Sequence, residues 1–196
     1  MKKCPEYVRV EGKLYKIDTN FKTAIECNRI AEDPSIGDFE RVLGIIYTLF
    51  GEEGLNNPDH YQRLLELAKM YLSCGKELDE KNNENPDMDY IQDYDLIWAS
   101  MYSDFHGLNI DKEDINWWDF NRLMNGLSNS ELGNCCVLNR VRNLRNLDLK
   151  NIKDKKERDR LAKAKQQVAL KKTKKEVKMT KEQQESADEF NKMLGL

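Results

Sequence analysis

Five cysteines and two histidines are the side chains of this 196-residue chain best suited to bind a metal ion or act as nucleophiles. The cysteines are Cys4, Cys27, Cys74, Cys135 and Cys136. A structural zinc site needs four ligands in close clusters. No two cysteines have the Cys-x-x-Cys spacing, and the histidines at 60 and 106 stand 46 residues apart. The sequence therefore predicts reduced, partly buried thiols, no metal site and no cofactor.

An acidic segment has aspartates at positions 87, 89, 93 and 95, a spacing similar to that of a calcium-binding loop. The pattern fails because Ile91, Gln92 and Trp98 occupy positions where the loop needs a ligand, a glycine and a glutamate. We interpret the segment as the acidic N-terminus of a helix that begins at Asp89, which the helix dipole favours.

Motifs for phosphate binding and for a serine nucleophile are absent from the sequence. Gly51 and Gly54 flank two glutamates, whose negative charges would repel phosphate. No residue is assigned a catalytic role, and we predict that the protein is not an enzyme.

An aromatic cluster surrounds residues 117–120, with Trp98, Tyr102 and Phe105 as further members. Its spacing favours a core seam between two helices over a partner-binding patch. Adjacent residues of a helix point about 100° apart, so we expect either Trp117 or Trp118 to lie at the rim. The rim tryptophan is the better candidate for binding a partner.

The charge is unevenly distributed along the chain. Residues 1–149 carry a net charge of −10 and residues 150–196 a net charge of +7. We predict an acidic body over 1–149, made of the hairpin and the helices, and a basic helical tail over 150–196 that is partly flexible. The tail is compatible with a solvated helix, with nucleic-acid binding or with an acidic protein partner. Its candidate partner-binding residues are Lys171, Lys172, Lys174, Lys175, Phe190 and Leu194.

Nucleic acid is the less favoured of these partners. Residues 150–178 contain thirteen Lys and Arg but no aromatic side chains on which bases could stack. The acidic body would also repel a polyanion.

The elements that position these residues are mainly helical. Val8, Val10 and Leu14 flank a Glu-Gly pair at 11–12, which predicts a β-hairpin over 7–17. Apolar residues at three- and four-residue steps predict helices near 18–30, 38–50, 58–72, 89–107, 111–126, 128–143 and 151–170. Asp18, Thr19 and Asn20 are the candidate caps of the first of these helices. The predicted fold class is mainly α: an N-terminal hairpin, a compact multi-helix domain and an extended basic C-terminal helical tail.

Location follows from what the sequence lacks. No apolar run reaches the ~18 residues that span a bilayer, and no apolar stretch follows the first lysines. We expect a cytoplasmic protein with no membrane partner.

Several short segments, taken in order, resemble a family of small proteins from phages and prophages of Gram-positive bacteria. They are Glu-Gly-Lys-Leu-Tyr at 11–15, Asp-Thr-Asn-Phe at 18–21, Ser-Cys-Gly-Lys at 73–76, Trp-Trp-Asp-Phe at 117–120, Leu-Ser at 127–128, and Asn-Ile-Lys-Asp-Lys-Lys-Glu-Arg at 151–158 leading to Ala169-Leu170. The resemblance covers about residues 5–172. The genes of this family lie between those of the tail tube and the tape-measure protein.

The resemblance implies a tail assembly chaperone that binds the tape-measure and tail-tube proteins and is absent from the finished virion. Such factors are often made in short and frameshift-extended forms. It carries over no catalytic residues. An amphipathic third helix, the tryptophan rim and residues 150–194 are the expected client contacts. Self-association is also compatible with the charge pattern. The alternatives are a structural tail component retained in the virion and, less favoured, a nonspecific nucleic-acid-binding protein.

Overall fold

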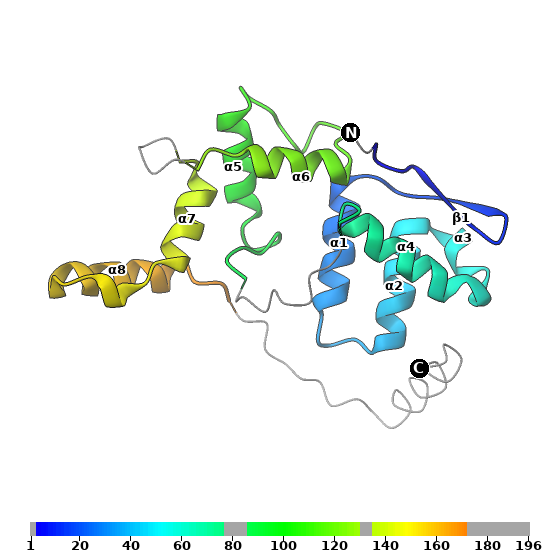
Figure 1. Ribbon diagram of the computed structural model, residues 1–196, viewed down its shortest axis with the longest axis horizontal. Helices are drawn as coiled ribbons and strands as arrows, with labels where there is room; N and C mark the ends of the chain where they lie inside the picture. Colours follow the sequence, from blue (N-terminus) through cyan, green and yellow to red (C-terminus); the bar gives the residue numbers. More distant parts are fainter. Residues whose placement is uncertain (1–2, 77–85, 130–134, 172–196) are drawn as a thin grey trace. The chain divides into compact units, whose positions relative to one another are not determined.

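The computed structural model describes residues 3–76, 86–129 and 135–171. In these residues a two-stranded hairpin precedes eight α-helices (Figure 1), which confirms the predicted mainly helical fold with an N-terminal hairpin. The strands are β1 (Tyr7–Val10) and β2 (Lys13–Lys16). The helices are α1 (Phe21–Glu32), α2 (Asp38–Phe50), α3 (Glu52–Leu55), α4 (Tyr61–Leu72), α5 (Tyr94–Asp104), α6 (Trp117–Gly126), α7 (Val137–Asn146) and α8 (Lys155–Gln167). Two 3₁₀ turns, η1 (Pro58–His60) and η2 (Leu149–Asn151), precede α4 and α8.

The chain divides into two compact units. Of the described residues, the first unit contains 3–76 and 115–120, and the second contains 86–114 and 121–171. α6 therefore begins in the first unit and continues in the second after Phe120. The predicted division near residue 150 is drawn on charge, and it stays a prediction.

The hairpin of the first unit forms around a two-residue turn. Glu11 and Gly12 both have positive φ, 47° and 87°, as the tight turn between twisted antiparallel strands requires. Val10 pairs with Lys13 and Tyr7 with Lys16. This register puts Val10 and Tyr15, both buried, against the helices of the unit.

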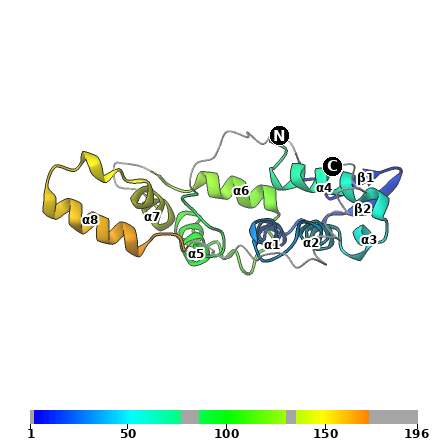
Figure 2. The ribbon, with the colours of Figure 1, turned by 90° about the horizontal axis from the view of Figure 1, so that it is seen from below.

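The longer helices of the first unit are α1, α2 and α4: α1 and α2 lie side by side and α4 lies across them (Figures 1 and 2). α1 begins after the last of the three predicted caps, Asn20, whose side chain accepts a hydrogen bond from the Lys22 N–H at 2.9 Å. The apolar stripes predicted from spacing are buried at Phe21, Ile46, Leu49 and Leu64, each with no exposed surface.

The second unit is organised by α5 and α7. Its buried apolar side chains are Ile97, Met101, Ile110, Leu127, Cys136 and Leu138. The first turn of α7 meets α5 through the buried Ser100, whose hydroxyl accepts a hydrogen bond from the Leu138 N–H at 3.1 Å. α7 lies between α5 and most of α8 in Figures 1 and 2.

Several helices begin later than the sequence predicts. α5 starts at Tyr94 rather than Asp89, and α6 starts at Trp117 rather than Asp111. Residues 89–93 form turns instead, because the Asp89 carboxylate accepts hydrogen bonds from the N–H groups of Ile91 and Gln92. α7 starts at Val137 rather than Ser128. Residues 130–134, which are part of the predicted helix 128–143, lie outside the described residues.

Residues 51–57, predicted to be only a turn, contain the one-turn helix α3. Among the described residues, no helix has the length and apolar character needed to cross a membrane.

Candidate functional site

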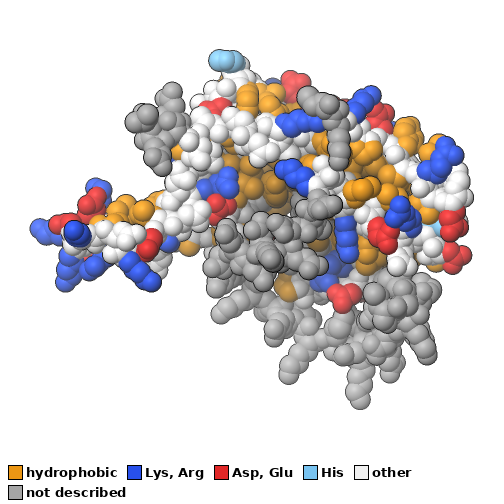
Figure 3. Space-filling model, in the orientation of Figure 1, with side chains coloured by type: hydrophobic (Ala, Val, Ile, Leu, Met, Phe, Trp, Pro, Cys, Tyr) orange, Lys and Arg blue, Asp and Glu red, His pale blue; other side chains and the backbone are white. Residues whose placement is uncertain are grey.

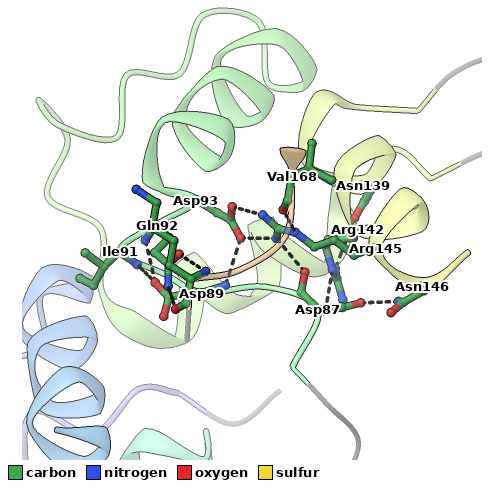
Figure 4. Close-up of polar contacts among 11 residues, drawn as sticks. Asp87, Asp89, Ile91, Gln92, Asp93, Asn139, Arg142, Arg145, Asn146 and Val168 are labelled. Atoms are coloured by element: carbon green, nitrogen blue, oxygen red, sulfur yellow. Dashed lines mark hydrogen bonds and ion pairs between the residues drawn. The ribbon is translucent and has the colours of Figure 1, made fainter. Parts of the chain in front are cut away.

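The most connected polar group of the second unit is centred on Arg145, and we call it the Arg145 cluster. It contains Asp87, Asp89, Gln92, Asp93, Arg142, Arg145 and Asn146 with the backbone of Val168 and Lys171 (Figure 4). These residues come from three parts of the chain: the turns before α5, helix α7, and the segment after α8. The cluster therefore joins parts of the sequence more than fifty residues apart.

Arg145 and Asp93 form a buried ion pair at its centre. The two guanidinium Nη atoms donate to the two carboxylate oxygens of Asp93 at 2.6 and 2.7 Å, and only 10% and 2% of the side chains are exposed. Arg145 also donates to the backbone carbonyls of Asp87, at 2.8 Å, and Val168, at 2.6 Å. The Asp89 N–H donates to Asp93 Oδ2 at 3.0 Å. Because its partners are fixed in geometry, the pair avoids the cost of burying an unpaired charge.

A more exposed pair lies beside it. Arg142 Nε donates to Asp87 Oδ1 at 3.1 Å, and the Asn146 amide donates to Asp87 Oδ2 at 2.9 Å. The side chains of Arg142 and Asp87 are 37% and 25% exposed, so solvent weakens this ion pair relative to the one at Arg145.

The segment after α8 is held by a side-chain amide. The Lys171 N–H donates to Gln92 Oε1 at 2.8 Å, and Gln92 Nε2 donates to the Lys171 carbonyl at 3.0 Å. The Gln92 side chain thus pairs with this backbone as a neighbouring β-strand would. Lys171, one of the predicted partner-binding residues, is exposed, and its backbone is held in the cluster.

The cluster has a structural role: its hydrogen bonds and ion pairs hold three segments of the chain together. Each of its carboxylates accepts hydrogen bonds from a cation or a backbone N–H. The aspartates at 87 and 93, two of the four in the calcium-like spacing, are paired with arginines. Among the described residues, no group of three or more His, Cys, Asp and Glu side chains is placed to hold a metal ion.

Sequence reasoning did not anticipate Arg142, Arg145 or Gln92. The sequence did contain one signal for an ion pair. Arg142 and Arg145 lie three residues apart at the end of the predicted helix 128–143 and just after it, and residues 86–111 have acidic charges only. Their partners are far apart in the sequence, so spacing alone could not pair them.

The two tryptophans predicted as partner-binding residues lie in the first unit. Both are buried, with 3% of Trp117 and 8% of Trp118 exposed. Their indole N–H groups donate to the carbonyls of Leu72, at 2.8 Å, and Tyr71, at 3.0 Å, at the end of α4. The prediction that one of them lies at a rim is therefore wrong.

The reason is that the first turn of α6 is covered both by the segment before α1 and by the end of α4. The residues around Asn116 pair with the segment before α1, through hydrogen bonds from Phe21 N to Ile115 O and from Trp117 N to Thr19 O. Phe120 stacks on Phe21 with ring centroids 4.4 Å apart. At this position two side chains 100° apart can both be buried. Their role in partner binding stays a prediction.

The third predicted helix offers little apolar surface to a client. Of its predicted stripe, Tyr61, Leu64, Ala68 and Tyr71 are buried within the first unit, and Leu65 and Leu72 are half-buried. The buried part of this stripe forms core, and the client contact of this helix stays a prediction. Among the described residues, the large apolar side chains that are exposed are Tyr7, Leu14, Tyr47, Met70, Ile91 and Tyr102.

A second polar group anchors the hairpin. The Tyr15 hydroxyl is hydrogen-bonded to His60 Nδ1 at 2.6 Å and accepts from the Asn57 amide at 3.0 Å. His60 Nε2 lies 3.5 Å from the carboxylate of Glu11, which is largely exposed. Tyr15 has no exposed surface, so this group fixes β2 on η1 and leaves no space for a substrate beside the hydroxyl.

All five cysteines lie in the described residues, and none of them forms a disulfide. Burial raises the pKa of Cys27 to about 12, so this thiol stays protonated. Burial also raises the pKa of Tyr71, whose hydroxyl donates to the Thr19 carbonyl at 3.2 Å.

A shallow polar hollow of about 560 Å³ opens on the second unit. Ser100, Asp104, Ser128, Cys135 and Arg140 are among its lining residues. Asp104 already accepts hydrogen bonds from the N–H and the hydroxyl of Ser128, both at 2.8 Å. We assign no chemistry to the hollow.

The remaining predicted partner-binding residues, Lys172, Lys174, Lys175, Phe190 and Leu194, lie outside the described residues. Of those that the structure does describe, Trp117 and Trp118 belong to the first unit and Lys171 to the second.

The described residues thus define a mainly helical protein whose buried polar groups hold its segments together. Comparison with known families identifies it more closely. The family model described as Bacteriophage Gp15 protein matches residues 2–170, and the chain belongs to that family of phage proteins. No curated protein and no solved structure matches the chain.

Proposed function

We propose that this protein is a phage tail assembly chaperone: a non-enzymatic protein that binds the tape-measure protein and promotes assembly of the tail tube around it in the host cytoplasm. The observation that carries the proposal is the match to a bacteriophage family over residues 2–170. The same span contains the ordered segments that resemble proteins encoded between the tail-tube and tape-measure genes.

The outer face of the hairpin is the surface best suited to a client. Tyr7 and Leu14, 54% and 52% exposed, lie on the face opposite the buried Val10 and Tyr15. Arg9 pairs directly with Leu14 on this face. An exposed apolar patch beside a cation suits an amphipathic client segment that carries carboxylates.

Co-expression with the tape-measure protein tests the proposal. The full chain should increase the soluble yield of the tape-measure protein and co-purify with it. The variant Tyr7→Ser with Leu14→Ser should lower this yield, whereas Tyr47→Ser with Met70→Ser, which replaces equally exposed side chains on α2 and α4, should not. A tape-measure protein that neither gains solubility nor co-purifies would contradict the chaperone function.

The main alternative is a structural tail component. Mass spectrometry of purified particles separates the two functions, because an assembly chaperone should be absent from them. Recovery of the protein in amounts comparable to a tail subunit would favour the structural function.

Nonspecific nucleic-acid binding is a further alternative, which rests on the basic residues after 150. Such binding should weaken steeply as salt rises, because phosphate contacts release counterions. We expect no shift of duplex DNA in a gel even at low salt. A shift that disappears with added salt would favour this alternative.

Deletion of residues 150–196 tests the contribution of the basic tail to client binding. If pull-down of tape-measure fragments is unchanged by the deletion, the tail plays no part in client binding and the contact must lie in residues 1–149.

A further inference from the structure

The outer face of α8 carries cations that the fold itself does not use. Lys156, Arg160 and Lys163 are exposed and follow one another at four- and three-residue steps, so they lie on one face of the helix. Lys and Arg side chains are gathered over α8 in the space-filling view, with a few carboxylates among them (Figure 3). We call Lys156, Arg160 and Lys163 the basic face.

The opposite side of α8 packs on its own unit. Leu161, Ala164 and Val168 are partly buried there, and Lys165 Nζ donates to the Leu147 carbonyl at 2.7 Å. α8 contacts α7 and η2. Within the described residues, none of the ion pairs includes a residue of the basic face.

Within the helix the charges of this face are only partly compensated: Asp159 lies three residues after Lys156 and four before Lys163. Like charges four residues apart, as at Lys156 and Arg160, destabilise a helix slightly. Only Glu157 and Asp159 provide negative charge on α8 itself. The helix thus has an electrostatic reason to bind an acidic surface.

The same unit exposes the complementary surface. Residues 86–111 contain six aspartates and no Lys or Arg. Two of the six, Asp87 and Asp93, are paired in the Arg145 cluster. Asp111, Glu113 and Asp114 are exposed in the turn before α6, and we call them the acidic turn. Lys112, also exposed there, offsets one of the three negative charges, and Asp111 accepts a hydrogen bond from the Tyr94 hydroxyl at 2.7 Å.

We propose that the basic face of α8 docks on the acidic turn of a second copy of this chain. The contact is heterologous, since two different surfaces meet, and each copy keeps one surface of each sign for a further copy. Charge complementarity within one unit favours this occupant over nucleic acid, because the carboxylates of that unit would repel phosphates. The inference is independent of the proposed function.

Sedimentation velocity of the full chain tests the contact. The protein should self-associate at about 50 mM salt and dissociate at about 500 mM, where surface charges are screened within a few ångströms. The variant Lys156→Glu/Arg160→Glu/Lys163→Glu should raise the dissociation constant by about tenfold or more, because like charges then face each other. The variant Glu113→Lys/Asp114→Lys should act in the same direction. A matched control, Lys16→Glu/Lys69→Glu/Lys76→Glu, changes net charge equally on exposed residues of the first unit and should leave association intact.

Two rescue experiments make the pairing specific. Each reversed variant alone should remain monomeric, but mixing the two should produce heterodimers, because one variant keeps the acidic turn and the other keeps the basic face. A chain that carries both reversals should self-associate again. Circular dichroism of each variant checks that the helices remain formed.

Other results overturn the proposal. A full chain that stays monomeric at low salt has no such contact. Equal loss of association in the control means that net charge, and not these surfaces, is responsible. If charge reversal of the basic face weakens self-association but charge reversal of the acidic turn does not, α8 docks on a different surface. Retention of duplex DNA by a monomeric chain, abolished by the α8 reversal, assigns the basic face to nucleic acid instead.

Discussion

Arg145 carries more structural connections than any other charged residue described above. Its guanidinium donates to Asp93, to the Asp87 carbonyl and to the Val168 carbonyl, so one side chain satisfies acceptors from three segments. Removal of one partner from a buried ion pair leaves an uncompensated charge, which costs far more than the net contribution of the intact pair. At the scale of the residue, the fold of the second unit depends on this contact.

The first prediction concerns this pair. Arg145→Met should lower the unfolding free energy of the second unit by about 3–5 kcal/mol, because Asp93 remains buried without a cation. Arg142→Met, which removes the more exposed neighbouring arginine, should cost at most about 1 kcal/mol. Hydrogen exchange of the amides in α5 and α7 measures both changes. Similar losses for the two variants would show that burial does not distinguish the pairs.

The second prediction concerns alkaline pH. Cys27, with an ordinary pKa of 9.0 raised to about 12, and Tyr71, with an ordinary pKa of 10.0 also raised, both ionise more readily in the unfolded chain. Their contribution to stability is complete below the unfolded pKa values and is lost as pH rises through the folded ones. The denaturation midpoint in urea should therefore fall between about pH 8 and about pH 10, the range in which an unfolded thiol ionises.

The matched variants for this test are Cys27→Ala and Tyr71→Phe. Each lowers stability at neutral pH by removing a buried group, but each should also flatten the alkaline decline. If stability declines with pH as steeply in both variants as in the unsubstituted protein, other groups cause the decline.

At the scale of the element, α8 depends on local interactions to an unusual degree. It has thirteen residues and none of them is buried. Short helices are marginal in water unless a packed face or a cap supports them. Here the Asp154 carboxylate accepts a hydrogen bond from the Glu157 N–H at 2.7 Å and places negative charge at the helix N-terminus.

The third prediction follows from this cap. Asp154→Ala should destabilise α8 by about 1 kcal/mol and accelerate hydrogen exchange of its amides about fivefold. Asp159→Ala removes the same charge from the middle of the helix, where no cap is lost, and should change exchange much less. Equal acceleration in the two variants would mean that charge alone, rather than the cap, supports the helix.

At the scale of the whole molecule, the chain leaves the first unit, returns to it at 115–120 and leaves again. The returning segment supplies Trp117, Trp118 and Phe120, which are all buried and which contact α1 and the end of α4. The first unit is therefore incomplete without residues that follow α4 by more than forty positions.

The fourth prediction tests this dependence. A fragment of residues 1–76 should fail to unfold cooperatively, because Phe21 and Tyr71 lose their aromatic partners. A fragment of residues 1–127 retains the segment and should protect the amides of α1 and α4 from exchange. Cooperative unfolding of both fragments at the same urea concentration would show that the returning segment is dispensable.

Local chemistry determined much of the fold from the sequence. The Glu-Gly pair at 11–12 predicts the hairpin because it allows a tight turn, and the three- and four-residue steps of Leu64 and its neighbours predict α4. The capping residues at 18–20 predict the start of α1, and the structure selects Asn20 among them. The short segments that resemble a phage family, and their order along the chain, also indicated that family, which the match over 2–170 confirms. These signals act over a few residues, or through their order along the chain.

The tertiary structure alone decided the burial of both tryptophans and the Arg145–Asp93 pair. Periodicity says which side chains share a helix face, but it does not say how many sides of that helix are covered. Asp93 stands in an acidic stretch that fits a helix N-terminus until Arg145, 52 residues later, is brought against it. The physical reason is the same in each case: burial and ion pairing depend on partners distant in sequence, and only the folded chain brings those partners together.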